Sequence, residues 1–221
     1  MKRCLAGIAG ALALLLPNTF TPLAAAQGSN NKYQVQRANS WVVAITDKTG
    51  VFSFAAHKHA VLATRWSARL TVHPEDPQTS SATVTVPVSS LVIDSKQARQ
   101  TAALGSGPSA DDIRTIQERM LSPGVLDAKS YPEIQFTTTA IEKEGADRLR
   151  VTGEFQMHGH TRTVTIPVHY ERAENSGFIL QGEFSIRQTD FGMKPESVAG
   201  GTVQVKDEVS IRFRVRIDRE E

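Results

Sequence analysis

Apolar residues recur at every second position in four stretches of the second half of the chain. The stretches span residues 149–157, 164–170, 178–186 and 209–217. The intervening positions are polar, so each stretch predicts a half-buried β-strand with its apolar side chains on one face. Turn signals at Gly159, at residues 175–177 and at residues 200–201 separate the stretches. They predict hairpins between neighbouring strands of an antiparallel sheet.

Shorter strand-like segments precede these four stretches. We expect strands at residues 33–35, 41–46, 51–56, 61–72 and 82–93. A hairpin-type turn at residues 47–50 joins the second segment to the third. The total of about eight to ten strands predicts an all-β fold, an extended antiparallel β-barrel, because closing a sheet removes its exposed edges.

The periodicity changes between residues 94 and 131. Ile113, Ile116 and Met120 repeat at the spacing of a helix. Ser109 followed by Asp112 is typical of an N-cap with an acidic residue at the third helical position. We therefore expect one short amphipathic helix within a long crossover connection.

The first residues have the layout of a cleaved secretory signal peptide. Lys2 and Arg3 precede an apolar stretch at residues 5–16, and three alanines follow at residues 24–26. The apolar stretch is shorter than the roughly 20 residues that a membrane-spanning helix needs. We expect export to the periplasm without a transmembrane segment. The expected organisation is a signal peptide at residues 1–26, a flexible tail at 27–32 and one barrel domain at 33–218.

Composition excludes several functions for the exported chain. The single cysteine, Cys4, lies in the expected signal peptide, so disulfides, thiolate metal sites and cysteine nucleophiles are excluded. Removing Lys2 and Arg3 leaves 23 of the 25 basic residues, which equals the number of acidic residues, 23. A nucleic-acid-binding domain is expected to be clearly basic, so nucleic acid is not an expected partner.

Two matches to catalytic motifs are interpreted as turns. Residues 105–110 fit the pattern G-x-G-x-x-A, but no strand leads directly into the glycines as a dinucleotide site requires. Residues 190–192 spell the metal-binding tripeptide of kinases without the other kinase motifs. The chain is therefore not expected to be an enzyme.

Four of the six histidines form two His-x-His pairs, His57 with His59 and His158 with His160. On an extended strand, such a pair points to one face with its Cα atoms about 6.6 Å apart. If the pairs met across the barrel, four imidazoles would bind Zn²⁺ or Cu²⁺. The alternative, which we favour, places each pair at a strand end, where it bonds a loop or faces water.

The apolar strand faces are the other candidate site. The residues expected to point inward are Phe52, Phe54, Leu70, Val84, Phe136, Phe155, Val164, Phe184 and Phe213. An eight-stranded barrel with this lining is either filled by its own side chains or holds one small ligand. The alternation by itself leaves both possibilities open.

The chain resembles the YceI-like family through a series of short segments in a shared order. In the second half they are residues 131–136 (YPEIQF), 151–155 (VTGEF), 158–161 (HGHT), 164–168 (VTIPV), 190–192 (DFG) and 207–209 (DEV). Residues 33–35, 51–54 and 125–127 agree with the same family. The resemblance thus spans roughly the whole chain after the expected signal peptide.

The resemblance implies an extended lipocalin-like barrel of about eight strands or slightly more, whose cavity holds a polyisoprenoid chain. It favours a non-catalytic periplasmic carrier of polyisoprenoid or quinone-type lipids. The expected partner is an amphiphilic or isoprenoid lipid, with a homodimer as a further option and no other cofactor. His57, His59 and His160 depart from the usual family form, and the two histidine pairs with Arg65 are candidates for contacts to a lipid head group.

Two alternatives remain for the function. One is a Zn- or Cu-binding protein on the same barrel, with His57, His59, His158 and His160 as ligands. The other is a packed structural or stress-related module that binds no lipid.

Overall fold

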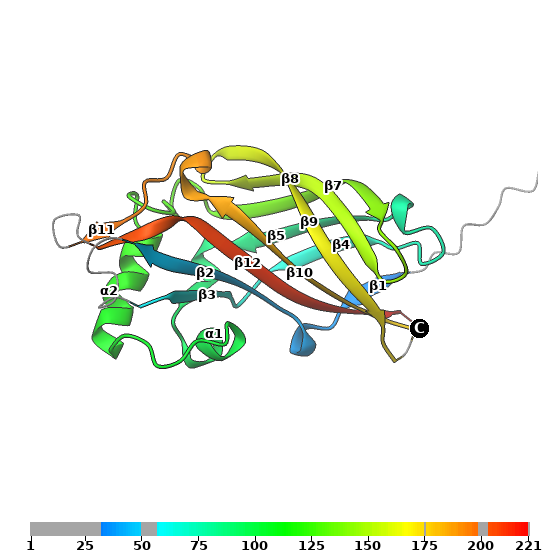
Figure 1. The fold of residues 1–221 in the computed structure, drawn as a ribbon, viewed down its shortest axis with the longest axis horizontal. Helices are drawn as coiled ribbons and strands as arrows, with labels where there is room; N and C mark the ends of the chain where they lie inside the picture. Colours follow the sequence, from blue (N-terminus) through cyan, green and yellow to red (C-terminus); the bar gives the residue numbers. More distant parts are fainter. Residues whose placement is uncertain (1–31, 50–56, 175, 199–202, 221) are drawn as a thin grey trace, which may run out of the picture. The chain divides into compact units, whose positions relative to one another are not determined.

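The computed structural model describes residues 32–49, 57–174, 176–198 and 203–220. Its strands are β1 (Tyr33–Val35), β2 (Trp41–Thr49), β3 (His59–Ala63), β4 (Ser67–Thr71), β5 (Ser81–Pro87), β6 (Leu91–Ile93), β7 (Glu133–Lys143), β8 (Arg148–Met157), β9 (His160–Arg172), β10 (Phe178–Arg187), β11 (Ser197–Val198) and β12 (Val203–Arg219). Within the described residues they form one antiparallel sheet that curls into a half-barrel (Figure 1). This confirms the predicted all-β, lipocalin-like fold.

The order of strands brings the first described strand, β1, beside the last, β12. Hydrogen-bonded neighbours follow the path β4-β5-β7-β8-β9-β10-β12-β2-β3-β6. The long strand β12 pairs with β10 and β11 on one side and with β2 and β1 on the other. The Glu220 N–H also donates to the carbonyl of Lys32, the last residue of the predicted tail. Among the described residues, backbone pairing therefore extends to Lys32, one residue before the predicted domain boundary.

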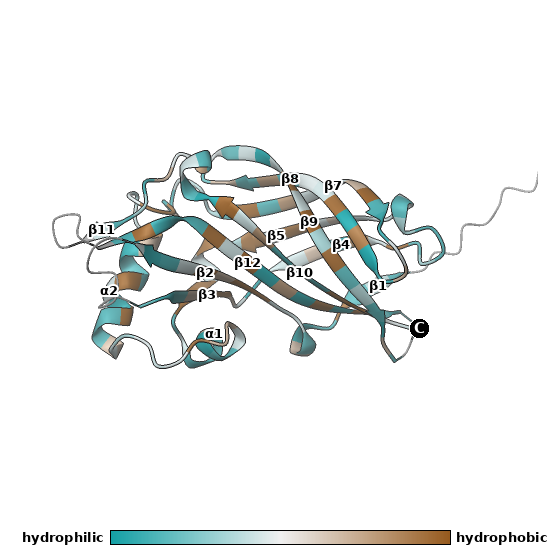
Figure 2. Ribbon diagram, in the orientation of Figure 1, coloured by the Kyte–Doolittle hydropathy of each residue, from teal (hydrophilic) through white to brown (hydrophobic). Residues whose placement is uncertain are grey.

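The four alternating stretches form β8, β9, β10 and β12, as predicted. Consecutive members pair antiparallel, so that Val151 faces Ile166 and Leu180 faces Val215 across the strands. Figure 2 shows hydrophobic and hydrophilic residues alternating along β9, β10 and β12. The apolar side chains share the concave face of the sheet, where they form the core clusters.

Two predicted strand segments are each divided in the structure. Residues 61–72 split between β3 and β4, and residues 82–93 split between β5 and β6. The buried Ser90 hydroxyl lies 2.8 Å from the carbonyl oxygen of Arg65 and 2.6 Å from that of Pro87. The Ser90 side chain therefore links the break between β3 and β4 to the break between β5 and β6. The predicted strand at residues 51–56 lies outside the described residues, and β2 continues through Thr49, where a turn was expected.

The crossover after β6 contains two helices rather than the one predicted. The expected helix is α2 (Ala110–Leu121), and its N-cap Ser109 accepts a hydrogen bond from the Asp112 N–H at 3.2 Å. The additional helix α1 (Lys96–Thr101) is only six residues long. Neither helix in the described part of the chain is long and apolar enough to span a membrane.

Helix α2 is fastened to the outer edge of β6 by one side chain. The Gln117 amide accepts a hydrogen bond from the Ile93 N–H at 2.8 Å and donates to the Leu91 carbonyl at 2.9 Å. The side chain thus satisfies backbone groups that an edge strand would otherwise leave unpaired.

A buried charge cluster holds helix α1 against β3. The Asp94 carboxylate is fully buried, with His59 Nδ1 2.5 Å from one oxygen and Arg99 Nη1 2.6 Å from the other. Arg99 also donates to the carbonyls of Gly105 and Ser106. The match to G-x-G-x-x-A is therefore a loop wrapped around a structural arginine.

Candidate functional site

An apolar cavity lies within the curl of the sheet. Its empty volume is about 1490 Å³, including the space that opens to solvent. Its walls come from β4, β5 and β7 through β10, together with β12. Besides the predicted residues, the larger wall side chains include Trp66, Ile134, Ile141, Leu149, Val151, Ile166, Tyr170, Phe178, Leu180, Ile211 and Val215.

Most of the residues predicted to face inward line this cavity. They are Leu70, Val84, Phe136, Phe155, Phe184 and Phe213. Val164 instead packs against two adjacent core clusters. Phe52 and Phe54 lie outside the described residues. Contact of these side chains with a lipid remains a prediction. Alternation could also have identified Tyr170, Phe178 and Leu180, whereas no periodic pattern marks Trp66, which follows β3.

The cavity ends at a packed aromatic cluster. The Phe155 ring meets Phe184 and Phe191 edge to face, with centroids 5.9 and 5.7 Å apart. Phe191 is only 1 % exposed and packs with Met193 and other buried residues that do not line the cavity. The interior is therefore solid on one side of Phe155 and Phe184 and hollow on the other.

Two strand glycines keep the hollow part open. A Cβ atom at Gly153 would lie 2.5 Å from the Phe136 ring, and one at Gly182 would lie 2.6 Å from the Phe213 ring. Each ring therefore rests against the bare backbone of a neighbouring strand. Glycine within a strand commonly marks such a close approach. A side chain at either position would push the aromatic ring toward the lumen.

The mouth of the cavity lies at the connection between β4 and β5. Among all the described lining residues, the exposed ones are Thr71, His73 and Ser81, which flank this connection. The remaining lining residues are buried or half-buried. The cavity thus has packed side chains at one end and exposed ones at the other.

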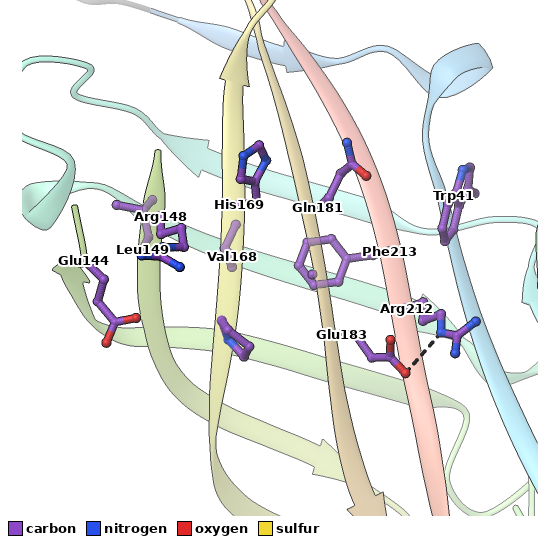
Figure 3. Close-up of a pocket in the computed structure, with 12 residues that line it drawn as sticks. Trp41, Glu144, Arg148, Leu149, Val168, His169, Gln181, Glu183, Arg212 and Phe213 are labelled. Atoms are coloured by element: carbon purple, nitrogen blue, oxygen red, sulfur yellow. Dashed lines mark ion pairs between the residues drawn. The ribbon is translucent and has the colours of Figure 1, made fainter. Parts of the chain in front are cut away.

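A second hollow lies against the same sheet but has different chemistry (Figure 3). It shares Leu149, Val168 and Phe213 with the cavity, but charged and polar side chains such as Arg148 and His169 surround it. In Figure 3, Glu183 and Arg212 point toward each other from neighbouring strands, 3.1 Å apart. This hollow is open to solvent, so its walls do not surround an enclosed apolar space.

The ion pair in this outer hollow is part of a small hydrogen-bonded group. The hydrogen bond from the Ser210 hydroxyl and the adjacent Arg212 guanidinium hold the pKa of the Glu183 carboxyl below its ordinary value, despite some burial. Its charge is thus already satisfied within the sheet, which leaves the apolar cavity as the better candidate for a ligand site.

The structure does not bring the four histidines together. The described residues contain no group of three or more His, Cys, Asp or Glu side chains that could hold a metal ion. His59 is bound to Asp94, while His158 Nδ1 lies 3.0 Å from the Phe191 carbonyl. His158 has a φ of +50° and forms the turn between β8 and β9, so it and His160 do not share one extended strand face. The four-histidine metal site that we kept as an alternative is therefore not assembled in the described part of the chain.

The residues proposed for head-group contacts do not line the cavity. His57 and Arg65 are exposed, and neither they nor the other paired histidines line the cavity. The polar residues at the mouth are instead Thr71, His73 and Ser81, and the adjoining polar pocket takes side chains from the ends of β7 and β9. Sequence spacing did not reveal them, because they come together only through the sheet order.

Comparison with known proteins identifies related sequences and folds. Residues 33–217 match the family described as the YceI-like domain. A "UPF0312 protein" of Pseudomonas putida (strain GB-1) is 29% identical over 113 residues, covering 48% of this chain and 55% of the relative. "Protein YceI" of Escherichia coli O6:H1 is 28% identical over 96 residues, covering 40% of this chain and 49% of the relative. The chain spans about half the length of the curated relatives it matches.

Two solved structures share the fold. Burkholderia cenocepacia BcnA superposes with a TM-score of 0.64 at 23% identity, covering 83% of this chain and 99% of that one. A polyisoprenoid binding domain from Saccharophagus degradans, implicated in plant cell wall breakdown, gives a TM-score of 0.57 at 12% identity. That match covers 86% of this chain and 99% of the other. At these identities the likeness concerns the fold alone.

Proposed function

The chain belongs to the YceI-like domain family, and from this premise we propose that it is a non-catalytic carrier of polyisoprenoid or quinone-type lipids. The observation that carries the proposal is the apolar cavity, whose aromatic and aliphatic walls end at Phe155 and Phe184. The polyisoprenoid binding domain of Saccharophagus degradans, which has a similar fold, supports the same ligand class.

The physical chemistry of the cavity favours a long apolar tail. Each buried CH₂ group contributes roughly 0.8 kcal/mol, so a few prenyl units outweigh the cost of ordering a flexible chain. The tail enters first, because the packed cluster around Phe191 closes one end and the mouth lies at the other. Apolar walls distinguish poorly between tails of different length, so selectivity must come from the head group.

The proposal is tested by identifying what the protein carries. Organic extraction of protein purified from its native envelope, followed by mass spectrometry, should yield a prenyl lipid in a ratio near one per chain. Extracted protein should then take up geranylgeraniol, a C20 prenyl alcohol, in a saturable titration. A lipid-free extract from monodisperse protein that also binds no added prenyl lipid would contradict the proposal.

The same proposal places the carrier in the periplasm. It is supported by the charged, apolar and small-residue regions in the first 26 residues. N-terminal sequencing of the exported protein should begin near Gln27. Recovery of chains that retain Met1 as the main cytosolic species would count against export.

A further inference from the structure

A polar pocket borders the mouth of the apolar cavity. It is lined by Pro74, Glu75, Lys143, Ala146, Asp147, His169, Tyr170, Glu171, Arg172 and Phe178. Pro74, Tyr170 and Phe178 also line the cavity, so the two spaces adjoin across these three side chains. If the tail of a lipid fills the cavity and leaves it beside Pro74, its head group lies next to this pocket, which we call the rim pocket.

The charges of the rim pocket do not favour an anion. Its carboxylates are Glu75, Asp147 and Glu171, against the cations Lys143 and Arg172. With a neutral His169, the formal sum is one negative charge. A site that binds phosphate through side chains normally presents an excess of Arg or Lys.

Two of the basic groups are already engaged. The Arg172 guanidinium lies over the Phe178 ring, 5.6 Å from its centroid, in a cation–π contact. His169 Nε2 lies 2.9 Å from Asp147 Oδ2. Within the described residues, Glu75 and Glu171 make no side-chain hydrogen bond or ion pair, so both carboxylates remain available as acceptors.

The available groups suit a head that donates hydrogen bonds and carries no negative charge. A hydroxyl group donates to the free carboxylate of Glu75 or Glu171, and Lys143 donates to its oxygen. A phosphate dianion has only acceptor oxygens, and the phosphate charge of about −1.5 to −2 is repelled by the carboxylates. A rim pocket with these groups would distinguish lipids by the charge of the head group. The apolar walls of the cavity cannot make this distinction, because they contact only the tail.

We propose that the rim pocket makes this protein select isoprenoid lipids with an uncharged, hydroxyl-bearing head over the same tails carrying a phosphate. This inference rests on the proposed function, because it assumes that the tail lies in the cavity. It adds the class of head group and assigns the choice to Glu75 and Glu171 at the mouth.

The test compares two ligands that differ only in the head group. Geranylgeraniol and geranylgeranyl monophosphate are titrated into lipid-extracted protein at low ionic strength and neutral pH. The alcohol should bind more tightly by roughly fivefold, as expected for a few unscreened charges acting across water. The preference should shrink in 1 M salt, where the screening length falls to about 3 Å.

Reversing the charges of Glu75 and Glu171 tests whether these two carboxylates cause the preference for the alcohol. In the double variant Glu75→Lys/Glu171→Lys, the phosphate should bind at least as tightly as the alcohol, while the affinity for the alcohol changes little. The matched control is Glu118→Lys/Glu154→Lys, which reverses two exposed carboxylates on α2 and in the middle of β8. It should keep the preference for the alcohol. The milder variant Glu171→Gln should reduce the preference, and circular dichroism checks the fold of each protein.

The outcomes separate this inference from the proposed function. Binding of neither ligand to the unmodified protein would overturn the cavity as a lipid site. Equal or tighter binding of the phosphate to the unmodified protein would overturn the rim selectivity while leaving lipid binding intact. A preference that the rim and control variants alter equally would also overturn the assignment to Glu75 and Glu171.

Discussion

Asp94 carries a negative charge in the interior of the protein, and its surroundings compensate for that charge. The residue has a positive φ of +49°, which aspartate tolerates better than most side chains. Its carboxylate receives hydrogen bonds from His59, from the Ala60 N–H and from Arg99. Removing one partner of a buried ion pair is strongly destabilising, because the other charge stays buried without compensation.

We predict that Asp94→Asn lowers the free energy of unfolding by about 3 kcal/mol at pH 7, the lower end of the range for breaking a buried ion pair. Asparagine also tolerates the positive φ, so the substitution removes the charge and keeps the backbone conformation. Urea denaturation measures the difference. Asp190→Asn, at an exposed position, is the control and should be nearly neutral. Equal stability of the Asp94 and Asp190 variants would show that the buried cluster contributes little.

The same residue predicts a dependence on pH. Burial alone raises the pKa of the Asp94 carboxyl, but hydrogen bonds from His59, Ala60 and Arg99, with the charge on His59, bring the pKa below its ordinary value. The stabilisation is therefore complete above the unfolded-state pKa of roughly 3.9 and is lost as the pH falls through the folded-state pKa. The stability gap between the wild type and Asp94→Asn should narrow steadily below about pH 4.

At the residue scale, alternation predicted which side chains share a face but not which polar groups meet. Six of the expected wall residues line the cavity because a strand with period two places them there. His59 was a candidate metal ligand, and its partner is Asp94, 35 residues away. No local pattern connects the two positions, since they meet only when β3 pairs with β6.

At the scale of elements, the strongly periodic strands were predictable and the short ones were not. The stretches that became β8, β9, β10 and β12 are long, with one buried face and clear turns between them. Residues 82–93 look like one strand, but the turn at Val88–Ser90 divides β5 from β6. Helix α1 escaped prediction because six residues are too few to show a helical period. Tertiary contacts to Arg99 hold it in place.

At the scale of the whole molecule, the sequence left open whether the barrel is packed or hollow. In the described part of the chain, one end of the interior is packed and the other is hollow. Alternation cannot distinguish them, because a lumen and a core are lined by the same inward side chains. The difference depends on what faces the wall residues from across the sheet. Phe191 comes from the turn after β10 and fills one end, whereas Gly153 and Gly182 leave room at the other.

This contrast gives a prediction in which one substitution is made in two environments. Phe184→Trp enlarges a side chain that lines the cavity, and Phe191→Trp enlarges one that is 1 % exposed in the packed cluster. Overpacking a filled core typically costs about 1–3 kcal/mol, so Phe191→Trp should lose stability on that scale. Phe184→Trp should lose less than about 1 kcal/mol, because the indole has empty space to enter.

For ligand binding the order of the two variants should be reversed, with the larger loss of affinity in Phe184→Trp. Phe184→Trp occupies volume that a prenyl tail needs, so its affinity for geranylgeraniol should fall roughly tenfold, equivalent to about two buried CH₂ groups. Phe191→Trp should bind with nearly unchanged affinity at temperatures where it remains folded. Thermal denaturation and ligand titration on the same preparations provide both values. If Phe184→Trp unfolds as readily as Phe191→Trp and binding is unaffected, the interior near Phe184 is a packed core and the protein carries no lipid there.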